Sequence, residues 1–427
     1  MMKSSDFELY RDRLLERFLK YVKIDTTSDK SAAGHPSTEG QRELLHILEE
    51  ELKDLGIEDI TLTGGGYLIA RIPPHPSAAG AEQYIGFMSH VDTSSDCPGA
   101  GVKPVIHRNY RGGVIALEQG TVIDPAEFPD LETAVGQTLI TSDGTTLLGA
   151  DDKAGLAEIM TAAEILVSKP DIPHCGIEII FTPDEETGTG MDEFPVKMLK
   201  SSCCYTMDGD TAGSVEAECF NAYKVDVNFT GKVIHLGKAR GKLVNAVSMA
   251  ALFVQMLPGN EAPESADGRY GYFCPLEISG GLEHARLEIY LRDFDEKKNL
   301  DRIKRLEDIA RGVEAVFERG KVEIKPSLQY TNMADRLMEH PAVMANLETA
   351  IVESGLTPVR KSIRGGTDGA RLTEMGIPTP NVFTGGQNYH SRQEYASLEV
   401  MVKAVETIVR LCGLWAGRNL YEGTSEN

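Results

Sequence analysis

Histidine and carboxylate side chains follow four short apolar runs of this 427-residue sequence. They are His90 with Asp92 after run 84–88, Glu185 with Glu186 after run 177–181, Asp208 after run 205–207, and His390 after run 381–383. A further carboxylate, Asp151, stands just before a predicted helix at 154–167, where the helix dipole favours a negative charge. Imidazole nitrogens and carboxylate oxygens are typical ligands of divalent cations, so the pattern predicts a metal site.

The number of candidate ligands favours two metal ions that share one carboxylate. His90, Asp208 and Asp151 would bind the first ion, and Asp151, Glu186 and His390 would bind the second. Two divalent cations exceed the charge of these three carboxylates by one, and a bridging hydroxide would neutralise the difference. The ligand types suit zinc, cobalt and manganese alike, and we expect zinc. Glu185 is not needed as a ligand, and a free carboxylate beside metal-activated water is suited to act as a general base.

Each residue taken alone also has a purely structural interpretation. His90 could be a hydrogen-bonded core histidine, the acidic stretch 184–186 a solvated turn, and Asp151 a helix cap. Independent surface features have no reason to follow four predicted strands in register, so the combined pattern favours the metal site. Seven of the other eight histidines lack such a context and are interpreted as structural, namely His35, His46, His75, His107, His174, His284 and His340.

The elements that must position these residues alternate between predicted strands and helices. This order predicts an α/β fold with a mostly parallel, mixed sheet flanked by helices, in which ligands bind at the carboxyl edge of the strands. Helices are expected over 7–22 and 38–56, with Gly56 at the C-terminal cap, and a β-hairpin over 138–148 around Ser-Asp-Gly. Residues 220–331 differ, because strands with one polar face surround helices at 245–257 and 298–319. We therefore expect a catalytic domain formed by 1–219 and 332–427, with an inserted α+β lid domain at 220–331.

Composition narrows the class of protein. The sequence is 41% hydrophobic and has a formal charge of −22, which argues against nucleic acid or anionic membranes as partners. No apolar run approaches the roughly 18 residues that a membrane span needs, and the charged N-terminus is unlike a signal peptide. Seven cysteines without a Cys-x-x-Cys motif, including the adjacent Cys203 and Cys204, are typical of a reduced cytoplasmic protein.

Several motifs, in order along nearly the whole chain, resemble the peptidase T family of tripeptide aminopeptidases. This family belongs to a clan of two-zinc exopeptidases that includes the aminoacylases and carboxypeptidase G. The motifs are Ser-His-Val-Asp-Thr at 89–93, Leu-Gly-Ala-Asp-Asp-Lys-Ala-Gly at 148–155, Phe-Thr-Pro-Asp-Glu-Glu at 181–186, Met-Asp-Gly at 207–209, Arg-Asp-Phe-Asp at 292–295, Arg-Gly-Gly-Thr-Asp-Gly at 364–369 and Thr-Gly-Gly-Gln-Asn-Tyr-His at 384–390.

The resemblance implies roles for residues near the expected ligands. Asp92 would orient the imidazole of His90, Asp151 would be the bridging ligand before a cis peptide bond to Asp152, and Glu185 would be the catalytic base. The segment 220–331 would correspond to a lid that closes over the substrate and that, in several relatives, mediates formation of a homodimer.

The resemblance also implies four substrate-binding residues, which are His235, Asn245 and Arg292 from the lid and Arg364 from the returning catalytic domain. Alternatives remain open at this stage. Arg292 could pair with a neighbouring aspartate, and Asn245 could be a helix N-cap. His235 is followed by leucine where the family often has proline, which bears on substrate choice rather than on the chemistry.

These observations predict a metallo-aminopeptidase that hydrolyses the N-terminal peptide bond of short peptides. Groups that bind the substrate's amino terminus and an arginine that binds its carboxylate would together measure peptide length, which predicts a preference for tripeptides. One alternative keeps the fold and metals but acts as an N-acyl amino acid deacylase or a carboxypeptidase-like amidohydrolase. Another is a peptide-binding protein without activity, which the complete set of expected residues disfavours.

Overall fold

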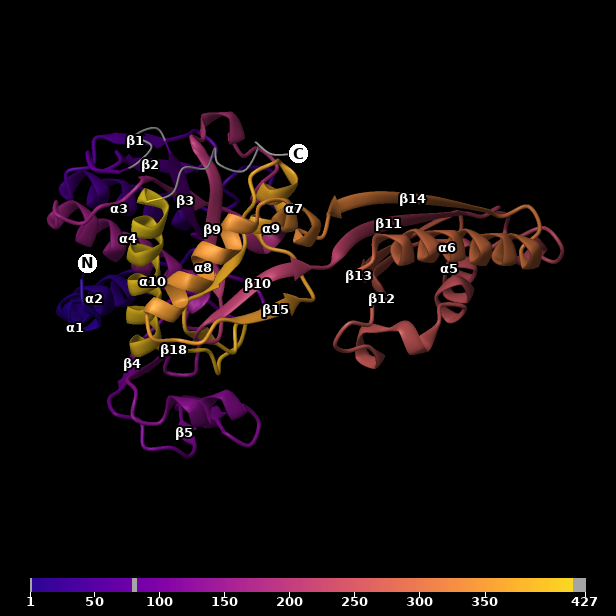
Figure 1. Cartoon of the computed structure of the whole chain (residues 1–427). Coiled ribbons are helices and arrows are strands. Elements are labelled where there is room, and N and C mark those ends of the chain that lie inside the picture. The colour runs from indigo at the N-terminus through magenta and orange to yellow at the C-terminus, as the bar shows by residue number, and fades with distance from the viewer. Residues whose placement is uncertain (1, 79–82, 418–427) are drawn as a thin grey trace, which may run out of the picture. The chain divides into compact units, whose positions relative to one another are not determined.

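The computed structural model describes residues 2–78 and 83–417, and the chain divides into two compact units. Unit 1 comprises Met1–Ala217, Asp335–Lys361 and Thr367–Asn427, and unit 2 comprises Glu218–Ala334 and Ser362–Gly366. Each unit contains its own β-sheet and helices, and each is described by itself (Figure 1).

Unit 1 is built around an eight-stranded mixed sheet with the order β1-β2-β8-β3-β9-β16-β10-β15. The strands are β1 Asp59–Leu62, β2 Leu68–Ile72, β3 Tyr84–His90, β8 Gly176–Thr182, β9 Ser201–Gly209, β10 Ser214–Cys219, β15 Val359–Ile363 and β16 Asn381–Phe383. The four central strands β8, β3, β9 and β16 pair in parallel, whereas β1 with β2, β2 with β8, and β16 with β10 pair antiparallel. The central strands are almost wholly buried apolar runs, as expected for parallel strands covered on both faces. The predicted fold class is confirmed.

Helices cover both faces of this sheet. Phe87 of β3 stacks against Tyr205 of β9, and the Tyr205 hydroxyl bonds to the α8 backbone and to the Trp415 indole of α10. The neighbouring Met88 belongs instead to a core cluster with Leu372 of α9. Because successive side chains of a strand point to opposite faces, α8 and α10 cover one face and α9 covers the other. Figure 1 shows α4 and α8 alongside α10, in agreement with their packing.

The helices of unit 1 are α1 Ser4–Phe7, α2 Arg11–Tyr21, α3 Glu39–Asp54, α4 Ala150–Ser168, α8 Pro341–Glu353, α9 Asp368–Glu374 and α10 Leu398–Ala416, and α7 Ala334–Glu339 begins at the last residue of the main segment of unit 2. The helices predicted over 7–22 and 38–56 are present with small differences at their ends. Gly56 has a φ of +85°, the left-handed conformation expected of a glycine at a helix C-terminus. The Asp151–Asp152 peptide bond at the start of α4 is cis.

Unit 1 contains a second, four-stranded sheet, whose pairing differs from the hairpin predicted over 138–148. Its order is β17-β18-β7-β4, with β4 Val105–His107, β7 Leu139–Thr141, β17 Gly386–Gln387 and β18 Tyr395–Ser397, and a separate pair joins β5 Ile115–Ala116 to β6 Val122–Ile123. The predicted hairpin over 138–148 is wrong, because β7 pairs with β4 and β18 rather than with the residues that follow it. The Ser142 hydroxyl closes a local loop onto Thr146, and the Leu148 amide is bound by the Glu394 carboxylate.

Unit 2 has a four-stranded antiparallel sheet with the order β12-β13-β11-β14. The elements are β11 Asn221–Thr230, α5 Ala246–Gln255, β12 Tyr272–Gly280, β13 His284–Asp293, α6 Glu296–Val316 and β14 Lys321–Tyr330. Buried and half-buried residues alternate along β11, and the buried ones form a core with α5 and α6, including a perpendicular pair of rings at Phe229 and Phe253. Residues 362–366, which the sequence pattern assigned to the returning catalytic segment, belong to unit 2, so the last two residues of β15 lie beyond the end of unit 1 at Lys361.

None of the helices in the described part of the chain combines the length and apolarity that a bilayer crossing requires.

Candidate metal centre

The parallel strands at the middle of the unit 1 sheet bring the candidate ligands to one edge. His90 is the last residue of β3, Asp208 lies next to the end of β9, and Glu186 follows β8 in a short turn. Parallel strands end at the same edge of a sheet, where ligands bind in open α/β folds. Gly155 allows α4 to approach this edge, because a side-chain carbon there would lie 2.1 Å from the Met207 carbonyl oxygen. The first turn of α4 therefore brings Asp151 close to β9.

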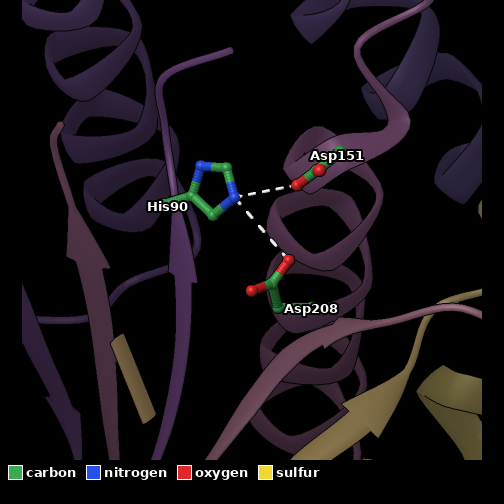
Figure 2. Close-up of side chains that lie close together, drawn as sticks. All are labelled: His90, Asp151 and Asp208. Atoms are coloured by element: carbon green, nitrogen blue, oxygen red, sulfur yellow. Dashed lines mark hydrogen bonds and ion pairs between the residues drawn. The ribbon is translucent and has the colours of Figure 1, made fainter. Parts of the chain in front are cut away.

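The first group of candidate ligands is His90, Asp151 and Asp208, which come from three different elements and point toward one another (Figure 2). The Nε2 atom of His90 lies 2.9 Å from Asp151 Oδ1 and 3.6 Å from Asp208 Oδ1. One potential ligand atom from each residue lies within 4.8 Å of the other two. The His90 ring is buried, so its nitrogen is presented to the carboxylates rather than to solvent.

The second group is Asp151, Glu186 and His390, with the same close spacing of ligand atoms. The Nε2 atom of His390 lies 3.2 Å from Asp151 Oδ2 and 2.9 Å from Glu186 Oε1. Asp151 thus presents one oxygen to each group, which is the arrangement of a bridging carboxylate. All five sequence-predicted ligands are brought together, in the two groups of three that the sequence pattern proposed.

Asp92 connects the first group to the turn that carries Glu185 and Glu186. Its Oδ1 lies 3.3 Å from Nδ1 of His90, the ring nitrogen that faces away from Asp151. The same carboxylate accepts hydrogen bonds from the backbone N–H groups of Glu185 at 3.0 Å and Glu186 at 3.1 Å. One buried side chain therefore orients an imidazole and anchors the turn that follows β8.

Sequence reasoning missed Glu394, which holds the backbone beneath Asp151. This buried carboxylate accepts hydrogen bonds from the N–H groups of Leu148 at 2.7 Å, Gly149 at 2.8 Å and Asp151 at 3.1 Å. Burial raises the pKa of Glu394 to about 7, although the three N–H groups oppose this shift. The available signal was an acidic residue directly before the buried strand at 395–397, four residues after His390.

The two histidines are strongly basic in the metal-free protein. The Asp151 and Glu186 carboxylates raise the pKa of His390 to about 11. Burial lowers the pKa of His90, but hydrogen bonds to Asp151, Asp208 and Asp92 outweigh it and place that pKa well above its ordinary value. Protons therefore hold these nitrogens against the carboxylates when no cation does.

The pKa of Glu185 lies well above its ordinary value. Desolvation is the main cause, and the nearby carboxylates of Asp208 and Asp368 add to it while His90 opposes it. Desolvation also raises the pKa of Asp208 to about 7. A carboxylate whose pKa is raised accepts a proton more readily than an exposed glutamate does, which suits Glu185 to act as a general base.

The donor set fits divalent metal ions. Each group offers one imidazole nitrogen and carboxylate oxygens, which are ligands of zinc and related ions. Within the described residues, the buried Glu186 Oε1 atom has no partner other than His390 Nε2, which lies 2.9 Å away. A buried carboxylate oxygen whose only partner is an imidazole nitrogen of the same group is placed as one of two ligands of a shared cation would be.

The four predicted substrate-binding residues all lie in unit 2, whereas the candidate ligands lie in unit 1. Asn245 is the N-cap of α5, and its side-chain oxygen accepts hydrogen bonds from Val247 N–H at 2.9 Å and Ser248 N–H at 3.4 Å. His235 is exposed, and its Nδ1 accepts a hydrogen bond from Gly237 N–H at 3.1 Å.

Both predicted arginines bond to backbone carbonyls of unit 2. The buried Arg292 donates to the Tyr223 and Leu291 carbonyls, and its guanidinium lies 4.5 Å from the centre of the Tyr290 ring. Arg364 donates to three carbonyls, those of Ala266, Gly268 and Tyr270. The three bonds of Arg364 connect residues 362–366 to the rest of unit 2. A role in substrate binding stays a prediction for all four residues.

Comparison with known proteins relates this geometry to a family. The family model described as Peptidase family M20/M25/M40 matches residues 143–413, which include Asp151, Glu185, Glu186, Asp208 and His390. The chain belongs to this peptidase family. Peptidase T of Escherichia fergusonii is 45% identical over 410 residues, covering 96% of this chain and 100% of the relative. Peptidase T of Clostridium perfringens is 45% identical over 401 residues, covering 94% and 98%.

Solved structures agree with this assignment. The aminopeptidase PepT of Bacillus cereus superposes with a TM-score of 0.73 at 25% identity, covering 95% of this chain and 99% of that one. The YXEP protein of Bacillus subtilis, described as a dinuclear metal binding peptidase from the M20 family, shares the fold with a TM-score of 0.65 at 14% identity, covering 95% and 98%. The predicted resemblance to peptidase T is confirmed. The chain is therefore an aminopeptidase that acts on peptides. Membership of this family, together with the two groups of candidate ligands, supports divalent metal ions as its cofactors.

Proposed function

We propose that this M20 aminopeptidase removes the N-terminal residue of short peptides, with tripeptides preferred, at a centre for two divalent metal ions. His90, Asp151 and Asp208 would hold one ion, and Asp151, Glu186 and His390 the other, with zinc as the expected metal. The observation that carries the proposal is the division of the Asp151 carboxylate, with one oxygen 2.9 Å from His90 and the other 3.2 Å from His390. When bound, the ions would supply Lewis acidity that activates water and polarises the scissile carbonyl.

Glu185 is the proposed general base. Its carboxylate would accept a proton from the attacking water and return it to the departing amine. The raised pKa of Glu185 supports this role, because it reduces the free-energy cost of carrying the proton between the two steps. Asp92 would keep Glu185 in place through the hydrogen bond to its backbone N–H.

Space for a small ligand exists in unit 1 next to His390. A cavity of about 360 Å³ lies between the loop that contains β6 and the residues that follow His390. Its lining residues are Cys97, Gly120, Thr121, Val122, Glu127, His390, Ser391, Arg392 and Gln393. This volume lies within the range of small-molecule pockets, which is roughly 300–1,000 Å³. The cavity therefore leaves room for a small ligand beside His390.

Other parts of the proposal depend on the family resemblance or on composition. Contacts of His235, Asn245, Arg292 and Arg364 with the substrate, and a homodimer formed through the inserted domain, depend on the resemblance alone. We place the enzyme in the cytoplasm, without nucleic acid or membrane partners. Six of the seven cysteines, at positions 97, 175, 203, 204, 274 and 412, are free thiols in the structure, which supports a reducing compartment.

A peptide panel tests the proposed activity. The purified protein would be assayed on matched di-, tri- and tetrapeptides with free and N-acetylated amino termini, before and after removal of metals with a chelator. We expect hydrolysis of free tripeptides above the other lengths, no hydrolysis of acetylated peptides, and recovery of activity when zinc is restored. Cleavage of acetylated substrates would favour the deacylase alternative, and equal rates at all lengths would contradict the tripeptide preference.

A further inference from the structure

The residue before the proposed base adopts an unfavourable backbone conformation. Asp184 has a φ of +58° and a ψ of 28°, in the left-handed region that side-chain-bearing residues seldom occupy. It connects the end of β8 at Thr182 to Glu185, and its side chain is buried. Such a conformation persists only where surrounding contacts determine it, and at functional sites it often contributes to the mechanism.

Side chains from the segment before α3 and from its first turn supply these contacts. One Asp184 oxygen, Oδ2, accepts the Ser37 N–H at 2.7 Å and lies 2.8 Å from Nδ1 of His35. The other oxygen, Oδ1, accepts the Ser37 hydroxyl and the Gln41 side-chain amide, the latter at 2.7 Å. The side-chain oxygen Oε1 of Gln41 in turn accepts the Asp184 N–H at 3.1 Å. Both the carboxylate and the backbone of Asp184 are thus held by residues about 145 positions earlier in the chain.

The same network reaches the far side of the turn. Nε2 of His35 lies 2.8 Å from the hydroxyl of Tyr67, which donates to the carbonyl of Gly190 at 2.9 Å. Gly190 has no room for a side chain, because a carbon there would lie 2.8 Å from the Pro183 carbonyl oxygen and 3.0 Å from the Glu185 nitrogen. Residues 184–190 therefore form a turn that contacts His35 at Asp184 and Tyr67 at Gly190, and the side chains of His35 and Tyr67 contact each other.

We propose that the Asp184 network, defined as His35, Ser37, Gln41, Tyr67 and Asp184, positions Glu185 and Glu186 for their roles in the metal centre. This inference rests on the proposed function. Asp92 fixes the two backbone N–H groups of the Glu185–Glu186 pair, and the Asp184 network fixes the residue immediately before it. Because Asp92 holds the backbone of the glutamate pair and the network holds Asp184, the directions of the Glu185 and Glu186 side chains are fixed more closely than by either contact alone. None of the five network residues is a candidate metal ligand, so all of them are positioning residues.

Two substitutions at Asp184 separate the carboxylate from the backbone conformation. Asp184→Gly removes every side-chain contact but accepts a positive φ without strain. Asp184→Asn also tolerates the left-handed conformation and keeps one acceptor oxygen. Gln41→Ala removes the reciprocal contact from the other side. Glu43→Ala is the matched control, because Glu43 is exposed on the same helix.

Each variant would be measured for kcat and KM on a tripeptide, for zinc binding to the metal-free protein by titration calorimetry, and for thermal unfolding. For Asp184→Gly we expect kcat to fall by about 10–100-fold with KM changed less than about threefold, and one of the two zinc ions to bind about 10–100-fold more weakly. Asp184→Asn should recover part of both losses, Gln41→Ala should show the same pattern at smaller size, and Glu43→Ala should match the parent.

The inference is overturned if Asp184→Gly and Gln41→Ala unfold at lower temperature yet keep parental kcat and parental affinity for both ions, since the network would then be a structural tie only. If Asp184→Gly does not fold, Gln41→Ala decides by the same criteria. Glu185→Gln separates this result from the proposed function. An active Glu185→Gln enzyme would reject the base, whereas an inactive one combined with normal Asp184→Gly and Gln41→Ala variants would reject only the network.

Discussion

Glu394 binds the backbone of Asp151, the residue that faces both histidines of the candidate metal centre. Its Oε1 accepts the Asp151 N–H at 3.1 Å, while Oε2 accepts the N–H groups of Leu148 and Gly149. The carboxylate therefore holds the chain that leads into α4 at the point where the bridging side chain leaves it. A position 243 residues away in the sequence thereby controls where Asp151 lies.

Replacement of Glu394 with glutamine should destabilise this segment. The amide nitrogen of glutamine would face backbone N–H groups, so at least one buried donor would lose its acceptor, which typically costs about 1–3 kcal/mol. We expect a loss of that size in the free energy of unfolding, measured by urea denaturation of the metal-free protein, together with weaker zinc binding. Glu132→Gln, at an exposed carboxylate of the same unit, is the control and should change neither quantity. Parental stability of Glu394→Gln would show that the three N–H groups find other acceptors.

Metal binding should release protons and become tighter as the pH rises. The pKa of His390 is about 11 in the metal-free protein, so at pH 6–8 its imidazole carries a proton that a cation must displace. The apparent affinity should increase by up to about tenfold per pH unit for each displaced proton. Calorimetric titration of the metal-free protein in two buffers of different ionisation enthalpy measures the number of protons released when metal binds. His46→Gln, at a largely exposed histidine, should leave it unchanged, and an affinity independent of pH would contradict protonated histidines at the site.

Glu185→Gln should separate catalysis from metal binding. Glutamine keeps the size and the backbone hydrogen bond to Asp92 but cannot accept the proton, so kcat should fall by about 10²–10⁴-fold. Two zinc ions per chain should remain, as measured by elemental analysis after dialysis. A variant with near-parental turnover would remove Glu185 from the role of base, and a variant with fewer than two ions would assign it a role in metal binding.

Removal of the shared carboxylate should affect both ions, unlike removal of a terminal one. Asp151→Ala deletes a contact to His90 and a contact to His390, so we expect fewer than one tightly bound zinc per chain. Asp208→Ala deletes a contact to His90 only, so one ion should remain. Elemental analysis of both variants at equal free zinc measures the difference. Equal metal content in the two variants would show that Asp151 does not bridge.

Much of the candidate site could be predicted from the sequence because its chemistry follows local patterns. Four apolar runs, each followed by one of the ligands His90, Glu186, Asp208 and His390, indicated strand ends, and parallel strands end at one edge of a sheet. The inserted α+β segment was likewise predicted from the sequence, because apolar and polar residues alternate along its strands, unlike the continuous apolar runs before it. These features depend on residues near one another in the chain, which is why local reasoning could find them.

Only the tertiary structure decided how the remaining polar residues pair. Glu394 and the Asp184 network act through hydrogen bonds between segments more than a hundred positions apart, and no local pattern distinguishes such residues from surface carboxylates. The same limit explains the hairpin predicted over 138–148, since β7 takes partners from distant segments in place of its sequence neighbour. Side-chain types and strand ends are local properties of the chain. The choice among possible hydrogen-bond partners depends on which segments the folded core brings into contact.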